Sequence, residues 1–326
     1  MHFEQIAADW LRLVRGKRSQ RGFSRRLGYS SNIAYRWETG ICFPTACEAL
    51  ALAKRDGAAG REALAAFSGP SAAPSWPSNL DLATRAGVAQ LLRGLRDKTS
   101  LVELARRSGH SRFSIARWLS GKAEPRLPEL LALIEAATFR LLDFLDCFTV
   151  VDKLPSVAED FRALKAARKT AYDVPWSHAV LRALELADYA KLGKHRSGWL
   201  ARRLGISREE EERCLAALAT SRQIRLRHGL WVMDETHTLD TRAEPARARR
   251  LKAEWLKVAL GRYEAGVSGS FGYNLMAISK ADWAKLKELH LAYFRNMQAL
   301  AADSSPGECV VLFNTELFAL DEPLRN

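Results

Sequence analysis

The sequence predicts a mainly α-helical protein with two tandem helix-turn-helix units, then a winged-helix-like module and a small α+β C-terminal domain. The main observation is an internal repeat, because residues 10–53 align without a gap onto residues 91–134 of the same chain. The second is a run of three short helical patterns and a hairpin signal between residues 176 and 234. Hydrophobic residues make up 48% of the chain, which is enough for folded cores.

Both copies of the repeat carry the same framework of small, basic and aromatic residues. Each position in the second copy lies 81 residues beyond its equivalent in the first, as 109 − 28 shows for two paired glycines. The repeat therefore predicts two similar helical units. The identical pairs include Arg25/Arg106, Arg26/Arg107, Gly28/Gly109, Ser30/Ser111, Arg36/Arg117, Trp37/Trp118, Gly40/Gly121, Pro44/Pro125 and Glu48/Glu129.

The helices of the first copy are expected from local signals. Ile6 and Trp10 mark the inner face of an opening helix, and Phe23 marks that of a short second helix. Gly28 is expected to end the second helix in a left-handed conformation, and Ser30 is expected to cap a third. From that third helix, the residues expected to face inward are Ala34 and Trp37, and those expected to face outward are Ser31, Asn32, Tyr35 and Arg36.

The framework SQ…G..S….RWE.G…P over residues 19–44 resembles the Cro/CI-type (xenobiotic-response-element-type) helix-turn-helix of phage and bacterial repressors. The resemblance implies double-stranded DNA as a partner, with Ser31, Asn32 and Arg36 near base edges in the major groove. Arg pairs well with guanine and Asn with adenine. The candidate DNA-binding residues of this copy are Gln20, Arg25, Arg26, Ser30, Ser31, Asn32, Tyr35 and Arg36.

The second copy keeps this skeleton with different chemistry. Leu101 stands where the first copy has Gln20, and Leu119 where it has Glu38. Phe113 suits contact with a thymine methyl group, but it equally suits a protein interface, so this copy either binds DNA or serves dimerisation or scaffolding. Its candidate DNA-binding residues are Arg106, Arg107, Ser111, Arg112, Phe113 and Arg117.

Two unlike recognition helices in one chain have a consequence for the DNA site. Repressors of this type dimerise to place two recognition helices about one helical turn of DNA apart. A tandem chain can supply both helices by itself. We therefore expect a preference for two dissimilar half-sites over a palindrome.

The module after residue 176 has the outline of a winged helix, with helices near 177–191, 197–204 and 208–221 and a hairpin at 224–227 and 230–233. The helix that would enter the groove opens with Glu209, Glu210, Glu211 and Glu212, and carboxylates oppose phosphates. At a helix N-terminus the same glutamates are stabilising. We therefore expect this module to connect or dimerise.

The C-terminal residues are expected to form a helix near 245–263, a strand at 271–278, a long helix over 280–301 and a strand at 309–314. His290 lies on an apolar stripe of the long helix and is expected to be a packing residue. The stretches 268–300 and 308–321 carry a resemblance to an uncharacterised family of inferred bacterial transcriptional regulators with a winged helix and an α+β domain. That resemblance implies regulation without specifying a mechanism.

Charge and composition restrict the partners. Lys and Arg exceed Asp and Glu by 50 to 37, which favours a polyanion such as nucleic acid. Five scattered cysteines without a CxxC pair indicate a reduced, cytoplasmic chain. No signal peptide is expected, because Asp9, Arg12 and Arg15 interrupt the apolar stretch that such a peptide needs near the N-terminus. No apolar run is long enough to suggest a membrane span. We expect no cofactor and no enzymatic activity, because no P-loop, GxGxxG, GxSxG or HExxH motif is present. His228 and His237 could help to bind a metal ion, but we expect them to belong to a polar turn instead.

These observations predict a cytoplasmic, sequence-specific DNA-binding regulator, more a repressor than an activator. Its C-terminal half is expected to form a homodimer or to sense a protein or small-molecule signal. The alternative is an antitoxin-like or phage-defence subunit whose main ligand is another protein. The expected organisation is a first unit at 1–67, a Pro/Ser-rich linker at 68–79, a second unit at 80–150, a connector and winged-helix-like module at 151–235, and an α+β domain at 236–326.

Overall fold

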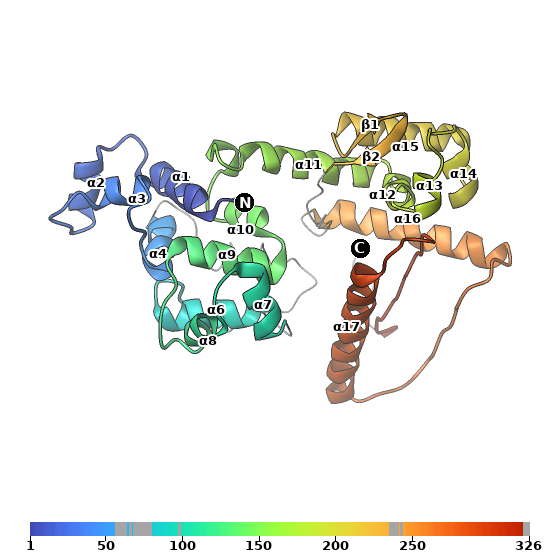
Figure 1. Cartoon of the computed structure of the whole chain (residues 1–326). Coiled ribbons are helices and arrows are strands. Elements are labelled where there is room, and N and C mark those ends of the chain that lie inside the picture. Colours follow the sequence, from blue (N-terminus) through green and yellow to red (C-terminus); the bar gives the residue numbers. More distant parts are fainter. Residues whose placement is uncertain are drawn as a thin grey trace. The chain divides into compact units, whose positions relative to one another are not determined.

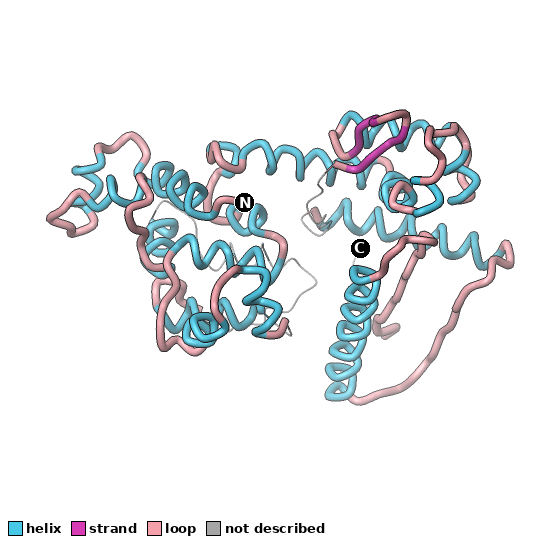
Figure 2. Tube along the Cα trace, in the orientation of Figure 1, coloured by secondary structure: helices cyan, strands magenta, loops and turns pink. Residues whose placement is uncertain are grey.

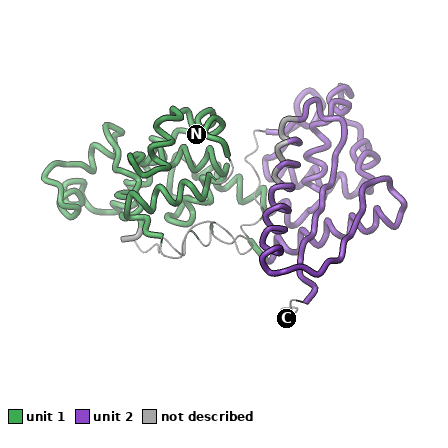
Figure 3. Tube along the Cα trace, turned by 90° about the horizontal axis from the view of Figure 1, so that it is seen from below, with its two compact units in different colours: residues 1–168, 236–245 green, residues 169–235, 246–326 purple. Residues whose placement is uncertain are grey.

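The computed structural model describes residues 1–55, 64, 67, 80–96, 99–234, 241 and 244–321. The chain is mainly helical, with one small hairpin among its described residues (Figures 1 and 2). It divides into two compact units, residues 1–168 with 236–245 and residues 169–235 with 246–326 (Figure 3). The expected linker at 68–79 lies outside the described residues.

The helices of the two repeats follow the same order in the first unit. The first repeat forms α1 (Phe3–Arg15), α2 (Gln20–Arg26), α3 (Ile33–Glu38) and α4 (Ala46–Arg55). The second forms α6 (Arg85–Arg96), α7 (Leu101–Ser108), α8 (Arg112–Leu119) and α9 (Leu127–Thr138). The unit continues with α10 (Leu141–Asp146), a 3₁₀ turn (Val151–Lys153) and the start of α11 (Ala158–Asp173).

The two repeats share one hydrophobic core. Trp10 and Trp37 of the first repeat belong to the same buried cluster as Leu91 and Trp118 of the second. Helix α1 packs on α9, and α4 packs on α6, so each repeat covers part of the other. Through this shared core the two repeats belong to one compact unit.

The second unit begins with α12 (Trp176–Ala183), α13 (Ala187–Ala190), α14 (Trp199–Leu204) and α15 (Arg208–Thr220). The antiparallel strands β1 (Ile224–Arg227) and β2 (Leu230–Met233) follow, joined by His228 and Gly229, both with positive φ. The pairing of these strands confirms the predicted hairpin. A two-residue turn with positive φ at both positions suits a hairpin, because its twist matches that of the two strands. The expected helix at 177–191 is split into α12 and α13. The unit ends with α16 (Pro245–Glu264) and α17 (Lys280–Asp303).

The predicted strands at 271–278 and 309–314 are wrong. Both stretches are described, and neither forms a β-strand. Apolar residues in an extended segment make a strand only where a neighbouring backbone supplies hydrogen bonds, and this pattern does not identify a partner. The side chain of Tyr273 is 92% exposed, in keeping with a segment that has no sheet to cover it. Between residues 244 and 321, which the structure describes, the C-terminal part is therefore α-helical with extended connections, and the strands of the expected α+β domain are absent there.

Local signals around α17 were more reliable. Ser279 caps this helix, since its hydroxyl accepts a hydrogen bond from the Asp282 backbone N–H, and the helix starts at Lys280 as expected. His290 is half-buried, with its imidazole nitrogens 3.1 and 3.0 Å from the hydroxyl oxygen of Thr315.

Candidate nucleic-acid interface

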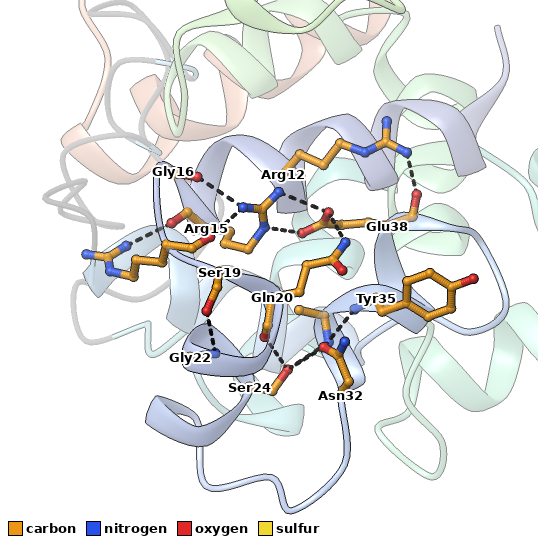
Figure 4. Close-up of polar contacts among 12 residues, drawn as sticks. Arg12, Arg15, Gly16, Ser19, Gln20, Gly22, Ser24, Asn32, Tyr35 and Glu38 are labelled. Atoms are coloured by element: carbon orange, nitrogen blue, oxygen red, sulfur yellow. Dashed lines mark hydrogen bonds and ion pairs between the residues drawn. The ribbon is translucent and has the colours of Figure 1, made fainter.

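Helices α2 and α3 are held together by a small set of polar contacts (Figure 4). Ser19 caps α2 by accepting from the Gly22 backbone N–H at 3.1 Å. Ser24 is 1% exposed, and its hydroxyl oxygen accepts from the Ala34 backbone N–H of α3 at 3.1 Å. The turn between the helices passes through Gly28 at φ 90°, the left-handed conformation that was predicted. Residues of α2 and of the turn after it therefore hold α3 in its position against α2.

The cap of α3 differs from the prediction. Asn32 caps this helix, not Ser30: Oδ1 of Asn32 accepts from the Tyr35 backbone N–H and lies 3.3 Å from the Ser24 hydroxyl. Asn is as good a cap as Ser, so the helix starts at the later of two possible caps. Ser30 and Ser31 then precede the helix as exposed residues. With Oδ1 of Asn32 engaged, a bidentate pairing with adenine would require the cap to open.

Gln20 belongs to a polar cluster around Glu38, whose side chain is 5% exposed. Its amide nitrogen donates to Oε2 of Glu38 at 2.8 Å, while Nε of Arg15 lies 2.5 Å from Oε1. Arg12 donates to the Glu38 backbone carbonyl, which ties α1 to the end of α3 (Figure 4). Gln20 thus joins the helices to each other, whatever its part in ligand binding.

The remaining candidates of the first repeat form an exposed, cationic surface. In the part of the chain that the structure describes, neither Arg25 nor Arg26 is paired with a carboxylate. On α3, Arg36 is exposed, Tyr35 is 49% exposed, and the inward side chain of Trp37 is buried, as predicted. One side of this helix therefore faces solvent with donor groups, and the other side packs in the core.

The second repeat presents a related but different surface. Ser111, the equivalent of Ser30, caps α8 by accepting a hydrogen bond from the Ser114 backbone N–H at 3.1 Å. Phe113, equivalent to Asn32, has no side-chain acceptor to cap a helix, so α8 starts two residues earlier than α3. Phe113 is 70% exposed, and the guanidinium of Arg117 lies 5.6 Å from its ring centroid. Together with exposed Arg112, these residues make an aromatic and cationic face.

The two neighbouring arginines on α7 form ion pairs with a single carboxylate. Arg106 and Arg107 each lie 2.5 Å from Oε1 of Glu103. The hydrogen bond from Arg106, with help from Arg107, lowers the pKa of Glu103 to about 2. The first repeat has Gly22 at the position of Glu103. The two repeats therefore differ in the electrostatics of otherwise identical arginine pairs.

The glutamate run on α15 has a structural member that the sequence did not single out. Glu211 is 1% exposed, and its two carboxylate oxygens accept from the backbone N–H groups of Gly198 at 3.1 Å and Ala201 at 2.7 Å. It thus satisfies donors at the start of α14. The helix itself is capped by Ser207. Only the apolar residues that follow every three or four positions hinted that Glu211 faces inward.

His195 lies between Tyr189 and Glu211. Its Nδ1 is 3.2 Å from the Tyr189 hydroxyl, and its Nε2 is 3.6 Å from Oε1 of Glu211. Because the hydroxyl already accepts from the Trp231 backbone N–H, it is free to donate to a neutral Nδ1. Burial lowers the pKa of His195 below its ordinary value, although Glu211 opposes this shift. Burial lowers the pKa of His178 as well.

We predict that the second unit loses stability as pH falls below the ordinary histidine pKa of about 6.5. A lowered folded-state pKa means that the unfolded chain binds protons first, so the contribution is complete above that pH and is lost as pH falls through the folded value. Hydrogen-exchange mass spectrometry of peptides from 176–233 at pH 7.5 and 5.5, corrected for the intrinsic exchange rates, measures this. His195→Gln should weaken the pH response, and an unchanged response would assign it elsewhere.

Among the described residues, no group of three or more His, Cys, Asp or Glu side chains is placed to hold a metal ion. His237, considered above together with His228, lies outside those residues. None of the described helices is both long and apolar enough to cross a membrane.

The structure thus defines a mainly helical protein with two exposed basic faces on a duplicated N-terminal unit. Comparison with known families finds a match over residues 157–320 to the family described as a domain of unknown function (DUF4423). The chain belongs to this family, which confirms that its C-terminal half is of an uncharacterised type; the match does not include the repeats. No curated protein and no solved structure matches the chain.

Proposed function

We propose that this protein is a sequence-specific, double-stranded DNA-binding transcriptional regulator, more a repressor than an activator. In this proposal, α2–α3 and α7–α8 are Cro/CI-type helix-turn-helix units, and α3 and α8 read the major groove. The observation that carries the proposal is that α3 and α8 have the same arrangement of buried and exposed residues. Each buries a tryptophan, Trp37 or Trp118, and exposes an arginine one residue before it.

The exposed side chains suit base edges. Arg36 and Arg117 can each donate two hydrogen bonds to the O6 and N7 atoms of guanine. Phe113 offers an apolar surface to a thymine methyl group. Asn32 contributes its amide nitrogen while its oxygen caps α3, so Arg36 is the main reader of the first repeat. The net charge of +13 supports attraction to the phosphate backbone.

Arg36→Ala tests the reading role. We expect binding to the cognate site to weaken by about 1–3 kcal/mol, with relaxed preference at one base pair, because a bidentate contact is lost. The cognate site is first selected from a random duplex library at about 150 mM salt. Affinities of wild type and variant are then measured on the selected site and on its single-base variants. An equal loss on every sequence would remove the base-reading assignment.

Arg25→Ala with Arg26→Ala tests the phosphate role. If both side chains contact phosphates, the double variant should bind all sequences more weakly and should lower the slope of log K against log salt by roughly 2, about one unit for each contact. Titrations between about 50 and 200 mM salt measure the slope. Base preference should stay unchanged, and an altered preference with an unaltered slope would contradict the assignment.

We further propose that the C-terminal half forms a homodimer or senses a signal. Helices α16 and α17 expose several large apolar side chains, including Leu256, Leu260, Leu289 and Leu300. Such a set in one region supports a protein interface. Light scattering of the intact chain measures its oligomeric state.

The second candidate function is a protein-interaction subunit, antitoxin-like or part of phage defence. The exposed ring of Phe113 favours it, because an exposed aromatic side chain also suits a protein surface. Isolation of the chain from nuclease-treated cells discriminates between the two functions. A stable partner that protects Arg36 would favour this candidate, whereas a defined DNA motif in the library selection would favour the regulator.

A further inference from the structure

The contact between the repeats joins equivalent positions. The backbone N–H of Ala46 donates to the carbonyl of Pro125 at 2.9 Å, and that of Leu127 donates to the carbonyl of Pro44 at 3.0 Å. Thr45 lies opposite Arg126 in an antiparallel bridge. With the offset of 81 residues, Pro44, Thr45 and Ala46 are the equivalents of Pro125, Arg126 and Leu127. Each repeat therefore gives the other the same pair of hydrogen bonds that it receives.

Such an exchange is the mark of a local two-fold axis. In an isologous interface, residue i of one copy contacts residue j of the other, and residue j of the first contacts residue i of the second. The axis here passes between Thr45 and Arg126. Two further contacts cross it: Arg126 donates to the Phe43 carbonyl at 3.2 Å, and Glu124 accepts from the Cys47 backbone N–H at 2.7 Å.

Helices α3 and α8 are tied to this axis through equivalent contacts. Arg12 of α1 donates to the backbone carbonyl of Glu38, and Arg93 of α6 donates to that of Leu119. Glu38 and Leu119 are the last residues of α3 and α8. Helix α1 packs on α9 and α4 on α6 within the shared core, so each exposed helix is held to the centre of the unit.

We propose that the two repeats form a fixed intrachain dimer, so that one chain alone fills a two-part DNA site at a single spacing. This rests on the proposed DNA-binding function. A duplex has its own two-fold axes, and repressor dimers use theirs to match two half-sites. Here covalent linkage and a common core replace the second subunit. The spacing of the half-sites is then set by the contact at Thr45 and Arg126.

The two halves of that site are unlike, and the repeats contribute unequally to affinity. Between residues 17 and 36 the first repeat has six basic residues and no acidic one; the equivalent residues 98–117 include five basic residues and Glu103. Glu103 forms ion pairs with Arg106 and Arg107, while Arg25 and Arg26 have no carboxylate partner among the described residues. The first repeat therefore supplies the larger part of the salt-dependent affinity, and the second adds Phe113 and Arg117.

A spacing series on the selected duplex tests the inference. We expect the intact chain to bind the native spacing best and to lose at least about tenfold in affinity when about 5 base pairs, half a helical turn, are inserted between the half-sites. Insertion of about 10 base pairs, which restores the helical phase but not the distance, should not recover the lost affinity. Repeats joined by a compliant tether would recover it, and recovery would overturn the inference.

Stoichiometry and symmetry give independent readouts. Native mass spectrometry with excess duplex should show one duplex bound to each chain. If chains dimerise through their C-terminal halves, the dimer should therefore bind two duplexes. Duplexes with either half-site in two inverted copies should each bind at least about tenfold more weakly than the native pair. Two chains on one duplex, or a palindrome that binds as well as the native site, would overturn the inference. Selection that yields no motif at all would instead defeat the proposed function itself.

Discussion

Replacing Glu211 with Ala should lower the free energy of unfolding of the second unit by about 3–5 kcal/mol. Each carboxylate oxygen of Glu211 accepts one backbone N–H, from Gly198 and from Ala201, and the side chain is 1% exposed. Alanine would leave two donors at the start of α14 without a partner in a region closed to water. The cost of such donors is the main part of the expected loss.

Urea unfolding monitored by hydrogen exchange in peptides from 176–233 measures this effect in the second unit. The neighbouring Glu212 is exposed on the same helix, so Glu212→Ala is a matched control that should change stability by less than about 0.5 kcal/mol. Glu211→Gln keeps one acceptor oxygen and should fall between the two. A loss below about 1 kcal/mol for Glu211→Ala would show that water or rearranged backbone satisfies both donors.

The role of Glu211 bears on how the acidic helix is interpreted. A run of glutamates at this place could belong to a groove-reading helix only if its side chains faced a ligand. Glu211 instead faces inward and stabilises α14, and Ser207 caps the helix in front of it. The expectation that this helix does not read DNA therefore depends on Glu209 and Glu212, which are exposed, and not on Glu211.

Helix positions were predictable because their signals are local. Gly28 after α2 and Gly109 after α7 both adopt the left-handed conformation, and Ser111 caps α8. Such features depend on a few adjacent residues, so one sequence is sufficient to find them. The same signals occur in both copies of the repeat, so each copy supports the helix positions predicted for the other.

Features that depend on contacts distant in sequence were harder to predict. The choice of Asn32 over Ser30 as the cap depends on the Ser24 hydroxyl, which belongs to another helix. The strands expected at 271–278 and 309–314 required a partner that no local pattern names. The exchange of hydrogen bonds around Thr45 and Arg126 is also invisible in the sequence, although the repeat makes it possible.

Gln20 shows how the repeat itself explains a side chain. Its place and that of Glu38 are taken by Leu101 and Leu119, so a hydrogen-bonded pair in one repeat is an apolar pair in the other. Leu119 is 7% exposed, and Leu101 packs against the core. Both members of the pair change together, which is expected when each polar group needs the other.

A double-mutant cycle on this pair should therefore show strong coupling. Glu38→Leu alone should destabilise the first unit by about 3 kcal/mol, because Gln20 and Arg15 lose a buried acceptor. Gln20→Leu alone should cost about 1 kcal/mol, since Glu38 keeps its contact with Arg15. The double variant reproduces the second repeat and should cost about 1 kcal/mol, less than Glu38→Leu alone. Unfolding in urea, followed by hydrogen exchange in peptides from 1–55, gives the four free energies.

The same double variant separates the structural role of Gln20 from a role at DNA. Arg15 can turn toward solvent when Glu38 is gone, as its side chain is 21% exposed and already donates to the Arg18 carbonyl. The variant should therefore stay folded, so its affinity for the selected duplex can be measured. If Gln20 serves only the Glu38 cluster, that affinity should be retained within about twofold, whereas loss of a phosphate contact would also reduce the salt slope by roughly 1. Additive free energies in the cycle would contradict the coupling and leave the paired replacement by leucines without a physical basis.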